Sequence, residues 1–233
     1  MSIERRIIRG TSVRALSSGD ALSIEGTAAP FRKYAQLKGF KETIAPGAFR
    51  GWLKRSADGT AGVDTACLFN HDPSQVLGRF SNRTLSAEEV SSGLNYRCLL
   101  PDTSFARDLH ASIARRDVTG CSFGFACDPS GSDEDWDEMD DDEADDGMRS
   151  RRSGRVIRRT IRNFKMVTDI GPVTFPAYTS GTEVNSRSLF TVEAIPEGCP
   201  VEFRALLMAA RGEDVDRANF AKRRRDLMNQ VIS

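Results

Sequence analysis

A fifteen-residue acidic stretch, "SDEDWDEMDDDEADD" at 132–146, limits what this chain can fold into. Eleven of its residues are Asp or Glu, and the sixteen residues at 149–164 include seven arginines. Segments with so much charge bury little apolar surface, so we expect the acidic stretch to be a solvated loop between two strands. The chain as a whole has 33 basic and 33 acidic residues, so its charge is uneven rather than in excess.

The segment before this stretch, "TGCSFGFACD" at 119–128, predicts a strand with two unlike faces. The bulky face carries Cys121, Phe123, Phe125 and Cys127, and the small face carries Ser122, Gly124 and Ala126. A bare face with one hydroxyl leaves room for an extended peptide to lie against the sheet. The alternative is that a serine beside glycine is only a small residue where another segment packs closely.

Patterning elsewhere favours a mainly β fold with helices, an α+β class. Short apolar runs bounded by turn residues predict strands over most of 21–178. A short helix is expected at about 48–55, and another begins near Thr103 or Ser104 as its N-cap. The segment "FRKYAQLKGFKE" at 31–42 is interpreted as a surface loop.

These patterns divide the chain into three parts. Residues 1–20 are polar and basic and form either a first strand or a loose N-terminal arm. Residues 21–180 are the compact domain, with the acidic and basic insertion at 130–160. Residues 181–233 are a polar linker and a helical tail, with helices expected at about 201–210 and 214–230.

Several classes of protein are disfavoured by the absence of their motifs. The five cysteines show no CxxC spacing, which suggests reduced thiols in a cytosolic setting and no zinc site. No signal peptide and no apolar run of membrane-spanning length is present. The chain also lacks a GxSxG elbow, HExxH, a P-loop and a dinucleotide fingerprint.

The residues that can carry chemistry are few. The chain has two histidines, His71 at the end of a strand and His110 in an amphipathic helix, where an ordinary helix position explains it. A serine hydroxyl needs a histidine as base, and that histidine needs a carboxylate to hold its tautomer. Ser122, His71 and Asp169 are the candidates, provided that the faces bearing Ser122 and Asp169 meet. Otherwise His71 caps a turn and Asp169 is an ordinary strand-end carboxylate.

Taken in order, six segments resemble the prohead (procapsid maturation) proteases of tailed bacteriophages. They lie within 21–178 and read "GTAAPF", "ETIAPGAF", "LFNHDPSQVLGRF", "GLNYRCLLP", "TGCSFGF" and "DIGPVTFPAY". Each segment alone is weak, whereas the ordered set is specific. The chain departs from the family's pattern at Arg116 and Asp117, where a glycine is common, and at Gly171 and Pro172.

The resemblance implies a serine endopeptidase with a herpesvirus-protease-like β-barrel flanked by helices. It implies His71 as general base, Ser122 as nucleophile and Asp169 as third member, where relatives often have Glu. It implies no metal or organic cofactor. The implied partners are the major capsid protein with its scaffold segment and further copies of the chain, inside the procapsid in the host cytoplasm; no membrane or nucleic acid is expected.

Two other readings stay open at this level. One is a catalytically silent scaffold or assembly protein of the procapsid with the same fold. The other is a β-rich binding module whose charged insertion docks a partner. For the tail, the segment "EVNSRSLF" at 183–190 is a candidate site of self-cleavage.

Overall fold

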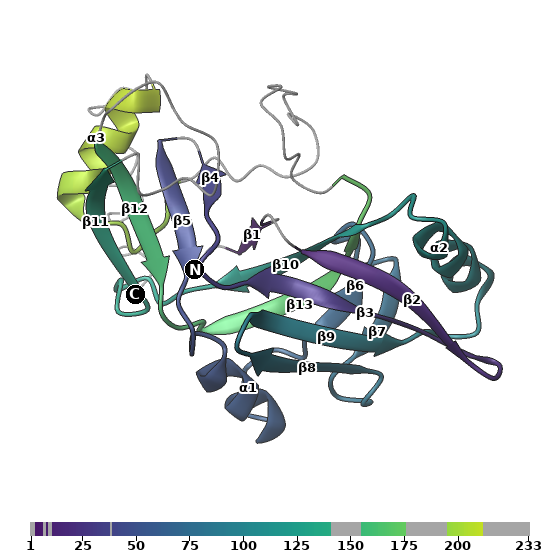
Figure 1. The fold of residues 1–233 in the computed structure, drawn as a ribbon. Helices are drawn as coiled ribbons and strands as arrows, with labels where there is room; N and C mark the ends of the chain where they lie inside the picture. Colours follow the sequence, from purple (N-terminus) through teal and green to yellow (C-terminus); the bar gives the residue numbers. More distant parts are fainter. Residues whose placement is uncertain are drawn as a thin grey trace, which may run out of the picture.

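The computed structural model of the chain describes residues 3–6, 8, 11–37, 39–140, 155–175 and 195–211. Thirteen strands in these ranges form three sheets, and three helices lie at the periphery (Figure 1). The α+β class with a predominance of strands is therefore confirmed. No helix in the described ranges is both long and apolar enough to cross a membrane.

The strands are arranged as follows. The five-stranded sheet has the order β1 (Glu4–Arg6), β10 (Gly120–Ala126), β13 (Met166–Val173), β6 (Ala66–Leu68) and β7 (Val76–Arg79). One four-stranded sheet has the order β2 (Ser12–Ser18), β3 (Ala21–Pro30), β9 (Gly93–Leu99) and β8 (Leu85–Val90). The other has the order β11 (Glu134–Asp140), β12 (Arg155–Ile161), β5 (Phe40–Ile44) and β4 (Ala35–Leu37).

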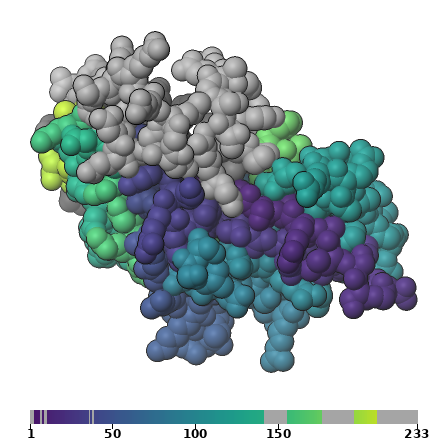
Figure 2. All heavy atoms as spheres, viewed as in Figure 1, coloured from purple at the N-terminus to yellow at the C-terminus, as the bar shows by residue number. Residues whose placement is uncertain are grey.

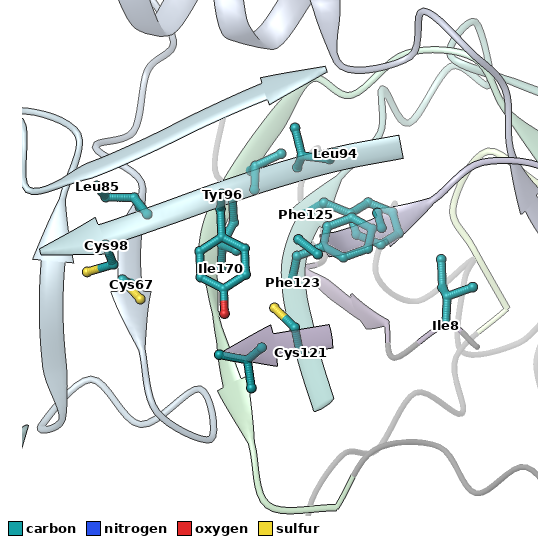
Figure 3. Packing of buried hydrophobic residues seen from close by; sticks show 14 of the residues in the cluster. Ile8, Cys67, Leu85, Leu94, Tyr96, Cys98, Cys121, Phe123, Phe125 and Ile170 are labelled. Carbon is teal, nitrogen blue, oxygen red and sulfur yellow. The ribbon is translucent and has the colours of Figure 1, made fainter. Parts of the chain in front are cut away.

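The main core lies between the five-stranded sheet and the β2–β3–β9–β8 sheet. The bulky face of β10 is turned into it, so Cys121, Phe123 and Phe125 are buried beside Leu94 and Tyr96 of β9 (Figure 3). The rings of Phe123 and Phe125 stack with centroids 5.1 Å apart. The prediction that Cys121, Phe123 and Phe125 share one face of this strand is therefore confirmed.

The helices follow their sequence signals. α2 (Ser104–Ala114) begins at Thr103, whose side chain accepts a hydrogen bond from the backbone N–H of Ala106 at 3.2 Å, as expected for an N-cap. α1 (Arg50–Ala57) buries Trp52. In Figure 1, α2 lies at the end of the molecule opposite α3 (Val201–Arg211).

The interpretation of residues 31–42 as a surface loop is wrong. β4 and the start of β5 lie there, and Phe40 is buried at 2% exposure. Its ring packs against Trp136 of β11 with centroids 5.2 Å apart. A small cluster of Phe40, Cys199 and Leu207 then joins this sheet to α3. The strand was missed because basic residues lie between the apolar ones in this segment.

The acidic stretch is not entirely a solvated loop either. Its first half forms β11, which pairs along its whole length with the arginine-rich β12. Opposite charges face one another across this pair, as where Arg158 donates from Nε to Asp137 Oδ1 at 2.8 Å. Cross-strand charge pairs of this kind stabilise a sheet. Residues 141–154 lie outside the described residues.

The expected barrel does not close. A barrel requires its last strand to pair with its first, whereas β1 and β7 both stay at edges of the five-stranded sheet in the described part of the chain. The other two sheets are open in the same way.

For residues 1–20 the structure favours the strand alternative over the loose arm. In the described part of this range, β1 pairs with β10 and β2 pairs with β3. The β2–β3 hairpin projects from the molecule (Figure 2, purple). α3 matches the first expected tail helix, and the second expected helix, at 214–230, lies outside the described residues.

Candidate active site

Ser122 and Asp169 come from neighbouring strands of the five-stranded sheet. β10 and β13 run antiparallel, with Ser122 opposite Gly171 and Gly124 opposite Asp169. Directly opposed residues of an antiparallel pair project to the same face. Ser122 and Asp169 therefore share the small face of β10, which is the condition that the sequence left open.

A β-bulge in β13 decides where Asp169 points. Phe125 on the core face of β10 pairs with Val167, whereas its neighbour Gly124 pairs with Asp169, so Thr168 is the extra residue. Strict alternation would put Val167 and Asp169 on one face. Because the bulge shifts the register, Val167 packs into the core while Asp169 turns to Ser122, a use of bulges that recurs beside active sites.

His71 is presented by a strained turn after β6. Asn70 and His71 both have positive φ, +53° and +57°, a conformation that is costly for side chains other than glycine. The turn is held by Asn70, whose backbone N–H donates to Pro172 O at 3.0 Å and whose Oδ1 accepts from Thr174 N at 2.9 Å. These bonds to the end of β13 aim the His71 ring back over the sheet.

The three side chains meet in one hydrogen-bonded line. Nε2 of His71 lies 2.6 Å from Ser122 Oγ, and Nδ1 of His71 contacts Asp169 Oδ1. Asp169 Oδ2 accepts a further bond from Thr168 Oγ1 at 2.9 Å. All three are buried, at 7% exposure for His71, 4% for Asp169 and none for Ser122. The order of atoms suits proton transfer from Ser122 to His71 while the carboxylate faces the developing positive charge.

The residues on the small face of β10 are small because neighbouring groups pack closely against them. The expected reason was room for a substrate. A Cβ on Gly124 would lie 2.3 Å from Asp169 Oδ2 and 2.6 Å from Thr168 Oγ1. A Cβ on the opposed Gly171 would lie 1.8 Å from the carbonyl oxygen of Leu68, at the end of β6. The two glycines therefore make space for the carboxylate and for the end of β6, the strand that precedes His71.

We predict that Gly124→Ala displaces the Asp169 carboxylate. The added methyl group has no free space, so we expect a loss of about 1–3 kcal/mol in the free energy of unfolding and a lower rate of proteolysis. Gly51→Ala is the matched control, because its Cβ meets only the side-chain ends of Asn163 and Arg55 and alanine favours the helix. Denaturant unfolding and peptide cleavage measure both effects; a Gly124→Ala protein as active as Gly51→Ala would contradict this account.

Some contributors to the site carried no usable sequence signal. Thr168 donates to the carboxylate, and Asn70 braces the turn, yet both are common polar residues beside a strand end. The carbonyl oxygen of Arg6, which accepts a bond from Ser122 Oγ at 2.9 Å, comes from the segment expected as either a first strand or a loose arm. Every residue has a backbone carbonyl, so the residue type at position 6 does not predict this contact.

The family of the chain follows from its similarity to a known protein family. The model of the caudovirus prohead serine protease family matches residues 10–195. The chain belongs to this family. Prohead proteases are serine proteases of tailed phages, so the chain is a serine protease, and the resemblance in the sequence is confirmed.

Among solved structures, the prohead protease is similar to the bacteriophage T4 capsid assembly protease, with 12% sequence identity and a TM-score of 0.39 over 74% of this chain and 96% of that one. No curated protein matches it.

Within the prohead protease, Cys121 is the rival nucleophile nearest to Ser122. Its side chain is on the core face of β10, and burial raises the pKa of its thiol to about 12, so it stays protonated at neutral pH. The second histidine, His110, is on α2 and contacts the carbonyl oxygen of Leu16 at 3.0 Å. Neither residue takes part in the Ser122, His71 and Asp169 cluster.

Proposed function

We propose that Ser122, His71 and Asp169 are the catalytic triad of this prohead protease. The observation that supports this is the 2.6 Å contact between His71 Nε2 and Ser122 Oγ, with Asp169 on the other ring nitrogen. Three residues about 50 to 100 positions apart in the chain meet with their polar atoms in the order that acyl transfer needs.

The reaction would proceed through an acyl-enzyme. With Nδ1–H of His71 donating to Asp169, the free Nε2 takes the Ser122 proton as Oγ attacks the peptide carbonyl carbon. His71 then gives this proton to the leaving amine, and the C–N bond breaks. A water molecule, deprotonated by His71 in turn, hydrolyses the ester and restores Ser122.

For the substrate we propose the major capsid protein of the same phage, cut within its scaffold segment, and the chain itself. The place would be the procapsid in the host cell, where many copies of both proteins are enclosed. The candidate self-cleavage segment at 183–190 lies outside the described residues.

The test is co-expression of the chain with that capsid protein, followed by intact mass measurement of both. Wild type should shorten the capsid protein, and Ser122→Ala should leave it at full mass. Ser23→Ala is the matched control, since Ser23 is also a buried strand serine, at 4% exposure, but lies in β3. A capsid protein shortened equally by the Ser122→Ala protein would refute the triad. Procapsids that assemble with no cleavage by wild type would favour the silent scaffold reading.

A further inference from the structure

The face of the five-stranded sheet that carries the proposed triad continues from β10 and β13 onto β6 and β7 (Figure 1). Asp169 of β13 pairs with Ala66 of β6, and Ala66 pairs with Arg79 of β7. Paired residues of neighbouring strands project to the same face of a sheet. Side chains of β6 and β7 that share this parity therefore lie on the same face as Ser122 and Asp169.

A second β-bulge, in β7, puts an apolar side chain on this face. Gly78 pairs with Cys67 and Val76 pairs with Leu68, so Leu77 is the extra residue. Strict alternation from Gly78, which faces the core, would turn Leu77 outward and Val76 into the core. The bulge reverses this, since Leu77 is buried at 2% exposure and Val76 is 37% exposed.

Leu68 and Val76 form an apolar pair next to His71. They are directly opposed across β6 and β7, and the loop that joins them carries His71. The backbone N–H of Phe69 donates to the carbonyl oxygen of Gln75 at 3.2 Å and closes this loop. Leu68 is half-buried and Val76 is exposed, so the pair presents an apolar surface at the base of the loop.

This pair lies in line with the proposed nucleophile. Ser122 is opposite Gly171, and a Cβ on Gly171 would lie 1.8 Å from the carbonyl oxygen of Leu68. Because neighbouring strands are about 4.8 Å apart, Leu68 is about 10 Å and Val76 about 14 Å from Ser122 across the sheet. An extended peptide advances about 3.4 Å per residue, so three or four residues cover this span.

The chemistry of His71 indicates which half of a substrate crosses this part of the sheet. His71 has to protonate the leaving amine, so that nitrogen must come within about 3 Å of Nε2. The segment after the cut bond begins at this nitrogen and continues past the loop that carries His71. Leu68 and Val76, at the base of that loop, are the apolar side chains in its path.

The exposure of Val76 also needs an explanation. Among the described residues, six large hydrophobic side chains are exposed, and Val76 and Phe175 are two of them. Phe175 follows Thr174, whose N–H donates to Asn70 beside His71 at 2.9 Å. Scattered apolar side chains on a surface are ordinary, whereas a group of them next to reactive residues is typical of a binding site.

We propose that Leu68 and Val76 line a subsite for an apolar side chain of the substrate, about three or four residues after the cut bond. This rests on the proposed role of Ser122 as nucleophile. The substrates are then peptides with Leu, Ile, Val, Met or Phe at this position, because a charged side chain there would lose its hydration against an apolar surface.

The test maps the bonds that the full-length protein cuts in a peptide library. The library is a bacterial proteome digested with an unrelated protease, and mass spectrometry identifies the new termini. We expect apolar residues three or four positions after the cut bond to be favoured about tenfold over their frequency in the library, the discrimination that a small apolar pocket provides.

Opposite charges at one position give the sharpest variants. Val76→Asp should lose the apolar preference and favour Lys or Arg at the same position, whereas Val76→Lys should favour Asp or Glu. A residue with only a structural role would not produce opposite preferences. Leu99→Asp is the matched control, because Leu99 is also an exposed strand residue, at 46%, but lies in β9 of another sheet. Its profile should match wild type.

A single peptide then measures the contact. In a peptide with a mapped cut, replacing the apolar residue by alanine should lower kcat/KM of wild type about tenfold. The same replacement should change kcat/KM of the Val76→Asp protein less than about twofold, because that contact is already lost. Should Val76→Asp fail to fold by circular dichroism, Val76→Thr keeps the shape of the side chain and should give an intermediate ratio.

The outcomes separate the subsite from the triad. Cuts that depend on Ser122 but keep the wild-type profile in Val76→Asp and Val76→Lys would overturn the subsite and leave the triad intact. An apolar preference only before the cut bond would overturn the subsite as well. No cut that depends on Ser122, in the library and in the co-expressed capsid protein, would overturn both together. Ser122→Ala gives the background.

Discussion

Replacing His71 by alanine should reduce proteolysis by about 10⁶-fold, to the level of the Ser122→Ala protein. This is the size of effect seen when the base of a serine protease triad is removed. The reason is that no other histidine can replace it: the second histidine, His110, is on α2 and contacts the carbonyl oxygen of Leu16. The measurement is the turnover of a peptide that contains the cleaved bond of the capsid protein.

The chain supplies the control for this prediction. His110→Ala removes the second histidine at a site that touches no member of the triad, so activity should stay within about twofold of wild type. Thermal unfolding of both variants separates misfolding from loss of the base. Comparable losses in a folded His71→Ala and a folded His110→Ala protein would show that the effect is structural.

Replacing Asp169 by asparagine should lower the turnover number by about 10⁴-fold, the size found for this change in a serine protease triad. The side chain keeps its shape, and Thr168 Oγ1 can still donate to its oxygen. What is lost is the negative charge opposite His71 Nδ1, which fixes the tautomer and stabilises the imidazolium that forms during catalysis.

Two further variants isolate the charge. Asp169→Glu retains it on a longer side chain and should keep more activity than Asp169→Asn. Asp64→Asn makes the same chemical change in a half-buried carboxylate bonded to Ser81, and should leave turnover unchanged. An Asp169→Asn protein within tenfold of wild type would refute the assignment of Asp169 as third member of the triad.

The sequence was most informative where a residue's type already limits its role. The period of two in 119–128 identified the face of β10 that packs into the main core, and Thr103 identified the start of α2, because both depend on local chemistry. The family, the α+β class and the three candidate site residues were likewise within reach of the printed sequence. Composition was misleading for β11, whose acidic residues are balanced by a strand some twenty positions later in the chain.

The sequence alone determined that a single histidine at a strand end, one serine on a bare strand face and a later aspartate were the residues able to form a triad. Only the tertiary structure decided that they meet. The bulge at Thr168 reverses the face of Asp169, and the turn at Asn70 aims His71. Neither can be read from periodicity. The bulge depends on the pairing of β10 with β13, whose partners lie more than 40 residues apart, and the turn depends on hydrogen bonds from Asn70 to residues about 100 positions later. The same holds for β1, which pairs with β10 and whose Arg6 donates to Glu42, a residue 36 positions later.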